Sequence, residues 1–88
     1  MAQRGADLQE LMDLKKAIQN LHHAIHQNRP IITRKLHGAF WKGPTADRFK
    51  SEWDGQFEKQ LEAISQALVE AANAVQVSHD NIDRATSA

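Results

Sequence analysis

The stretch His37-Gly38-Ala39-Phe40-Trp41-Lys42-Gly43-Pro44 decides the fold, because it separates two long segments with helical periodicity. It holds three of the chain's six glycines and prolines, the residues that most often interrupt helices. A short connection between two long helices favours an antiparallel hairpin. We therefore expect a turn at residues 40–44.

The segment before the turn predicts one helix over about residues 7–39. Asp7 is placed to act as its N-cap, because a carboxylate can accept from free backbone N–H groups. The apolar residues recur at spacings of three, four and seven, which is typical of one helix face. They are Leu11, Leu14, Ile18, Leu21, Ile25 and Ile32, with Leu36 and Phe40 continuing the row.

Pro30 interrupts this segment, because it has no N–H to donate to the carbonyl of His26. The helix either kinks near Pro30 and continues, or stops near Asn28 and is followed by a second short helix. The row Ile32, Leu36, Phe40 resumes the same spacing and favours the kinked helix.

The segment after the turn predicts a second helix over about residues 45–83. Proline at its start is well tolerated, because the first turn of a helix leaves its N–H groups unpaired. The apolar face consists of Ala46, Phe49, Trp53, Phe57, Leu61, Ile64, Leu68, Ala71, Val75 and Ile82. Residues 1–6 and 84–88 are small or polar, and we expect them to fray.

A two-helix hairpin of this length cannot bury both apolar faces, since each helix covers only one side of the other. We predict an all-α fold with a single domain, residues 1–88, that pairs with a second copy or a related hairpin into a dimeric four-helix bundle. The expected partner interface consists of Leu14, Ile18, Leu21, Ile25, Phe49, Trp53, Phe57, Leu61, Ile64 and Leu68.

Composition excludes several functions. The chain has 88 residues, a formal charge of zero and no cysteine, which argues against most enzyme folds, electrostatic nucleic-acid binding and thiolate metal sites. No apolar run approaches the ~20 residues that span a bilayer, so we expect no stable membrane insertion. The start has no apolar signal-peptide core. No catalytic motif or cofactor-binding loop is present, and we expect no cofactor.

Two polar clusters have functional alternatives. His22 and His26 are four residues apart and could bind one metal from the same helix face, but a surface histidine pair is the favoured interpretation. Basic residues surround the turn, where only Asp47 opposes them; such an end could meet an acidic receptor patch, anionic lipid or nucleic acid, although a solvated bundle end is the simpler explanation. These basic residues are Arg29, Arg34, Lys35, Lys42, Arg48 and Lys50.

The turn carries a further pattern. Trp41-Lys42-Gly43 lies near the middle of the chain, Phe49 follows the Trp by eight residues, Trp53 follows by another four, and residues 71–74 are rich in alanine. From about residue 8 to 83, the chain resembles the WXG family of small secreted helical hairpins, also called early secretory antigenic target-like proteins.

The resemblance implies a function. Such proteins are non-enzymatic substrates of type VII secretion systems, some of them virulence effectors, exported folded from the bacterial cytoplasm as homodimers or heterodimers without a cleavable signal peptide. By resemblance, Trp41 and Gly43 form part of a composite export signal read by the secretion ATPase. An alternative is a cytosolic chaperone-like partner of a larger WXG-type toxin.

The other part of the family's signal is a C-terminal Tyr-x-x-x-Asp/Glu motif, and this chain has no tyrosine. Val75 and His79 occupy the corresponding positions, and His79-x-x-x-Asp83 gives another frame. We expect that a partner chain supplies the missing half of the signal.

Overall fold

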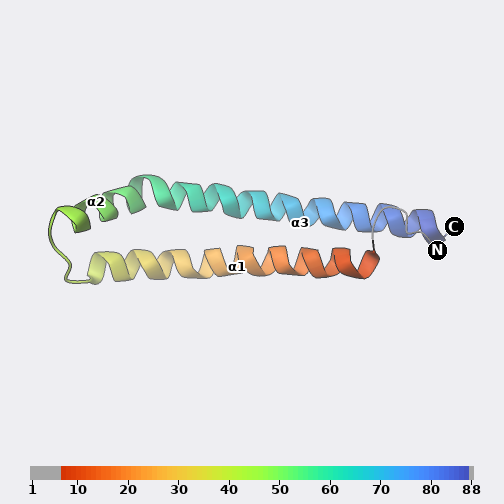
Figure 1. The fold of residues 1–88 in the computed structure, drawn as a ribbon, viewed down its shortest axis with the longest axis horizontal. Helices are drawn as coiled ribbons and strands as arrows, with labels where there is room; N and C mark the ends of the chain where they lie inside the picture. Colours follow the sequence, from red (N-terminus) through yellow and green to blue (C-terminus); the bar gives the residue numbers. More distant parts are fainter. Residues whose placement is uncertain (1–6, 88) are drawn as a thin grey trace.

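The computed structural model describes residues 7–87, which form a helical hairpin without a strand in this range. The first arm is α1 (Leu8–Gly38). The second arm consists of α2 (Pro44–Glu52), the π-helix η1 (Trp53–Phe57) and α3 (Glu58–Ser87), which follow one another directly. The arms run antiparallel, with the turn at one end of an elongated molecule of 64 × 18 × 16 Å (Figure 1). The expected fraying of residues 1–6 and 88 lies outside the described residues.

Helix α1 begins as the sequence predicted. The Asp7 carboxylate accepts from the backbone N–H of Glu10 at 2.9 Å. The helix continues through Pro30 as one element, so the alternative of a helix that stops near Asn28 and is followed by a second short helix does not occur. Both Pro30 and His26 are exposed, so water can reach the carbonyl that proline leaves without a helical donor. Leu36, near the end of α1, is among the few buried residues.

The turn depends on Gly43, which is the N-cap of α2 and has φ +115°. A side chain at this φ is strained, which explains glycine here. The Gly43 carbonyl accepts from the N–H of Asp47 at 2.9 Å, and Pro44 occupies the first helical position. Phe40 lies in the turn, within the expected range 40–44, but it does not continue the apolar row of α1, because it is 93% exposed.

The second arm contains a π-helix that periodicity did not predict. Trp53 is the first residue of this π-helix and lies against α1, where its indole Nε1 donates to Thr33 Oγ1 at 2.9 Å. Helix α3 also ends later than expected, at Ser87. Residues 84–87 are therefore helical, and the Thr86 hydroxyl donates to the Ile82 carbonyl at 2.9 Å in these last turns.

The core is small for a chain of this size. Among the described residues, the buried side chains are Leu36, Ala46, Trp53, Ser65 and Ala72. Trp53, which the sequence assigned to a partner interface, is only 6% exposed and packs inside the hairpin. The remaining apolar residues are half-buried or exposed, so the monomer leaves much of its apolar surface in water.

Candidate interaction site

One side of the hairpin is held by polar contacts between the arms. Helix α1 contributes residues at spacings of seven and four, which places them on one face. The contacts join Lys15 Nζ to Gln76 Oε1 (2.6 Å), His22 Nδ1 to Ser65 Oγ (2.7 Å), Arg29 Nη1 to Glu62 Oε2, Thr33 Oγ1 to Glu58 Oε1 (2.7 Å) and His37 Nε2 to Asp54 Oδ1 (2.9 Å). These bonds fix the register of the two arms.

Most of these partners gave no signal in the sequence. Thr33, Ser65 and Gln76 look like residues of a solvated helix face, and their partners are 20 to 61 residues away along the chain. The seven-residue spacing of Lys15, His22 and Arg29 is the single sequence feature that could have predicted these polar contacts between the arms.

Electrostatics along this side favour the ionised carboxylates. A hydrogen bond from Gln66, and then one from Arg29, hold the pKa of Glu62 below its usual value. A hydrogen bond from His79, and then one from Gln76, lower the pKa of Asp80. The Arg29 Nε atom is buried without a hydrogen-bond partner, so Arg29 is only partly satisfied by Glu62.

The neighbouring side of the hairpin is apolar and open. Successive helical residues are rotated by about 100°, so Leu14 and Leu21 lie on a different side of α1 from Lys15 and His22. Leu21 is 51% exposed, and Ile64 on α3 is 47% exposed. We define the apolar face as Leu14, Ile18, Leu21, Ile25 and Ile32 of α1 with Leu61, Ile64 and Leu68 of α3. Of these, Leu14, Leu21, Ile32 and Ile64 are exposed and the others half-buried.

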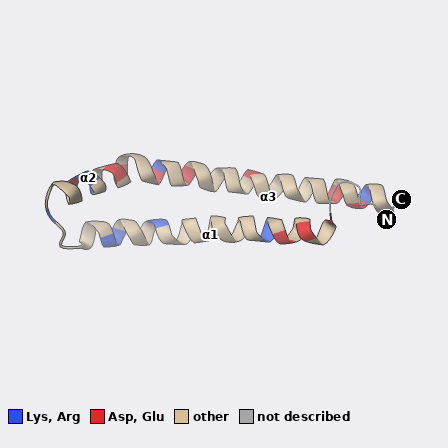
Figure 2. Cartoon of the chain, in the orientation of Figure 1, with Lys and Arg blue, Asp and Glu red and all other residues tan. Residues whose placement is uncertain are grey.

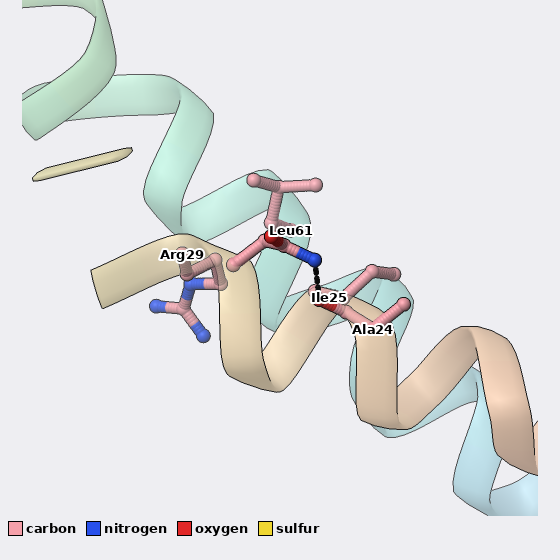
Figure 3. A pocket seen from close by; sticks show the side chains of 5 residues that line it. Ala24, Ile25, Arg29 and Leu61 are labelled. Atoms are coloured by element: carbon pink, nitrogen blue, oxygen red, sulfur yellow. Dashed lines mark hydrogen bonds between the residues drawn. The ribbon is translucent and has the colours of Figure 1, made fainter. Parts of the chain in front are cut away.

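The apolar face contains a hollow between the two arms. It has a volume of about 210 Å³ and is lined by Ala24, Ile25, Asn28, Arg29 and Leu61. Figure 3 shows Ile25 of α1 and Leu61 of α3 at this hollow, with the Arg29 side chain beside them. Its lining is mainly apolar, so a side chain of a partner helix could fill it.

The turn motif lies at the end of the hairpin. Trp41 is 40% exposed, and its ring centroid is 5.9 Å from that of Phe49. Phe49 in turn is 6.2 Å from Phe57, and Lys50 Nζ donates to the Trp41 carbonyl at 3.1 Å. The motif is therefore held in place by α2, while part of the Trp41 ring stays open to solvent.

The C-terminal positions that stand in for the missing tyrosine motif are less accessible. Val75 and His79 are half-buried, and His79 Nδ1 lies 3.1 Å from Asp80 Oδ1. Asp83 is exposed and takes part in an interaction of its own. The two half-buried residues are thus poorly placed for direct recognition by another protein.

The histidines do not form a larger cluster of ligands. The His22 and His26 rings are stacked, with centroids 6.2 Å apart, and His22 Nδ1 is bonded to Ser65. Within residues 7–87, no group of three or more His, Cys, Asp or Glu residues is arranged to hold a metal ion.

Over the same residues, no helix has the length and apolar character needed to cross a membrane.

Comparison with known proteins gave no match: no family model, curated protein or solved structure matches the chain.

Proposed function

We propose that the protein is a non-enzymatic substrate or adaptor of a type VII secretion system, which folds in the bacterial cytoplasm and leaves the cell as a dimer. The observation that carries this proposal is the turn itself. Trp41 is half-exposed at one end of a long hairpin, steadied by Phe49, with Gly43 two residues away at a positive φ. A displayed aromatic ring on a rigid support suits a signal that a translocase reads.

The dimer is supported by the open apolar face. Contiguous apolar surface of this kind on a soluble chain is typical of a protein–protein interface. A second hairpin laid on this face would bury Leu14, Leu21, Ile32 and Ile64 and complete a four-helix bundle. The partner is a second copy or a related hairpin.

Charge supports an antiparallel arrangement of two copies. Residues 34–57, which form the turn end of the hairpin because His37 pairs with Asp54, carry five Lys or Arg and three Asp or Glu, a formal charge of +2 (five minus three). Residues 7–16 and 70–86, at the other end, carry six acidic and three basic residues, a formal charge of −3 (three minus six). Antiparallel pairing sets the basic end of one hairpin beside the acidic end of the other, which favours association.

The second half of the export signal is proposed to come from the partner or from another region. This chain has no tyrosine, and Val75 and His79 are half-buried beside α1. In a heterodimer, a related hairpin would supply the tyrosine motif. In a homodimer, Trp41 at both ends of the bundle would have to be sufficient.

The test is export of a Trp41→Ala variant from a host with an active type VII system. We expect export to be lost while the dimer remains, because the Trp41 ring lies at the end of the hairpin rather than on the apolar face. Lys42→Ala, at the variable middle position of the motif, is the matched control and should be exported normally. Normal export of Trp41→Ala, or loss of its dimer, would refute the signal assignment.

The open apolar face also fits a chaperone-like partner of a larger toxin with its own helical hairpin. In that case the chain would co-purify with one larger protein. Substituting Leu21→Ser on the apolar face should then abolish the co-purification, while Trp41→Ala should leave it unchanged.

A further inference from the structure

The hollow on the apolar face is surrounded by residues of both arms. Ala24, Ile25, Asn28 and Arg29 of α1 line it together with Leu61 of α3, and its volume is about 210 Å³ (Figure 3). The Asn28 side chain is turned back onto its own helix, where its Nδ2 donates to the Ala24 carbonyl at 2.7 Å. Four residues of one helix form the hole that accepts a side chain of a facing helix in knobs-into-holes packing. The hollow is therefore suited to a single apolar side chain of a partner.

A side chain of this kind stands beside the hollow on the same face. Leu21 is 51% exposed and lies one helical turn before Ile25. It is not one of the residues that line the hollow of its own chain. Each hairpin thus presents an exposed leucine next to an unfilled hollow, which is the arrangement that two identical surfaces need in order to complement each other.

Antiparallel pairing of two copies brings the leucine and the hollow together. Helix α1 spans residues 8–38, so its midpoint is near residue 23. Leu21 lies just before this midpoint and Ile25 just after it, at the same distance. When α1 lies antiparallel on α1 of a second copy, the partner's Leu21 is therefore at the level of Ile25, which lines the hollow. Symmetry repeats this contact, so each copy inserts one leucine and receives one.

The charges of α1 are compatible with this pairing. No Lys, Arg, Asp or Glu occurs at residues 17–28, and Figure 2 shows this uncharged middle of α1 between charged ends. Glu10 lies one turn before Leu14, and Lys35 lies about one turn after Ile32, so both border the apolar face; both are exposed. Within one hairpin they are about 37 Å apart along the helix axis. In the antiparallel pair, Glu10 of each copy comes beside Lys35 of the other.

We propose that the apolar face recognises a second copy of this chain through a reciprocal contact, in which Leu21 of each copy fills the hollow of the other. Glu10 and Lys35 form an ion pair at each end of this contact. The inference rests on the dimer of the proposed function, and it adds the identity of the partner and the residues that select it. A related hairpin without an apolar side chain at this position would leave the hollow empty, and the residues lining it would lack packing contacts.

The dimer dissociation constant of the purified full chain, measured by sedimentation equilibrium, tests the proposal. Leu21→Ala should raise this constant about a hundredfold, because two buried leucine side chains are truncated per dimer and each contributes at least about a factor of ten. Val77→Ala is the matched control. Val77 is 58% exposed and lies about 140° around α3 from Ile64, so this change should leave the dissociation constant unaltered.

Filling the hollow from its own chain gives an independent variant. Ala24→Leu should raise the dissociation constant about tenfold or more, because the partner's Leu21 can no longer enter. Adding Leu21→Ala to Ala24→Leu should recover most of the lost affinity, since the larger side chain at position 24 then occupies the space. A general effect of Leu21 on the stability of the hairpin would give no such recovery.

A charge reversal tests the orientation of the two copies. Lys35→Glu should raise the dissociation constant about fivefold, because two attractive contacts per dimer become repulsive, and Glu10→Lys in the same chain should restore it. Arg34→Glu is the matched control, because it makes the same charge change one residue away, on the side of α1 turned from the apolar face. Its effect should be less than about twofold.

The outcomes separate this contact from the proposed function. A dimer that is unaffected by Leu21→Ala, or an affinity lost in Ala24→Leu and not recovered by the added Leu21→Ala, would overturn the contact and leave dimer formation and export standing. A chain that stays monomeric at every concentration would overturn both the contact and the pairing of two copies. Export of Trp41→Ala depends on neither result.

Discussion

At the scale of single residues, the two tryptophans have different environments and should have different roles. Trp53 is buried inside the hairpin, and its indole N–H donates to Thr33 Oγ1 at 2.9 Å. Trp41 is half-exposed at the turn and its ring contacts Phe49. The first links the two arms, and the second is available to other molecules.

This difference predicts unequal effects on stability. Trp53→Phe keeps an aromatic ring but removes the hydrogen bond to Thr33, so it should lower the free energy of unfolding by about 1 kcal/mol. Trp41→Phe should change it by less than about 0.5 kcal/mol, as is usual for exposed sites. Urea unfolding followed by circular dichroism, at one protein concentration, measures both. Equal losses in the two variants would mean that Trp41 also belongs to the core.

At the scale of elements, the arms and the turn follow from the sequence, whereas their irregular features do not. Apolar spacing and the Gly43-Pro44 pair are local signals, so they predicted two helices and the connection between them. The π-helix at residues 53–57 begins with Trp53, whose indole contacts Thr33 twenty residues away, and local spacing does not contain that contact. For the same reason, the sequence assigned Trp53 to a partner interface and Phe40 to the face of α1.

Pro30 gives the element-scale prediction. It lies inside α1, where it removes a backbone hydrogen bond. Alanine restores this bond, but it also gives the unfolded chain more conformational entropy, which offsets part of the gain. Pro30→Ala should therefore raise the free energy of unfolding by about 2 kcal/mol. Pro44→Ala is the matched control. Pro44 begins α2, where proline is well tolerated, so this change should bring no gain in stability. A destabilising effect of Pro30→Ala in the same urea titration would mean that Pro30 does not weaken α1.

At the scale of the whole molecule, the two arms are held in one register, but the hairpin does not bury all of its apolar side chains. The polar contacts from Lys15–Gln76 to His37–Asp54 align the arms, while the apolar face remains open. The sequence predicted this incompleteness, because each helix can cover only part of the other. It did not predict which side is open, since that depends on the polar pairs between the arms.

We propose that the apolar face pairs with another hairpin, and charge favours a second copy in antiparallel orientation. In that arrangement the apolar faces of the two copies meet, and α1 of one copy lies on α1 of the other. The midpoint of α1 is near residue 23. A residue on one side of this midpoint therefore lies beside the partner residue that is equally far from it on the other side. Leu14 and Ile32 are such a pair. In a parallel arrangement, α1 of one copy would instead lie on α3 of the other. Because Lys15 and Gln76 lie side by side within one hairpin, residues near 15 would then lie beside residues near 76 of the partner.

Disulfide trapping can detect this pairing, because the chain has no cysteine of its own. We predict that Leu14→Cys mixed with Ile32→Cys, after exchange of subunits and mild oxidation, gives a covalent dimer. Neither variant alone should do so, since two copies of the same residue would lie about 27 Å apart along the helix. A covalent dimer from Leu14→Cys mixed with Val75→Cys, or no covalent dimer in any mixture, would contradict the antiparallel pairing of two copies.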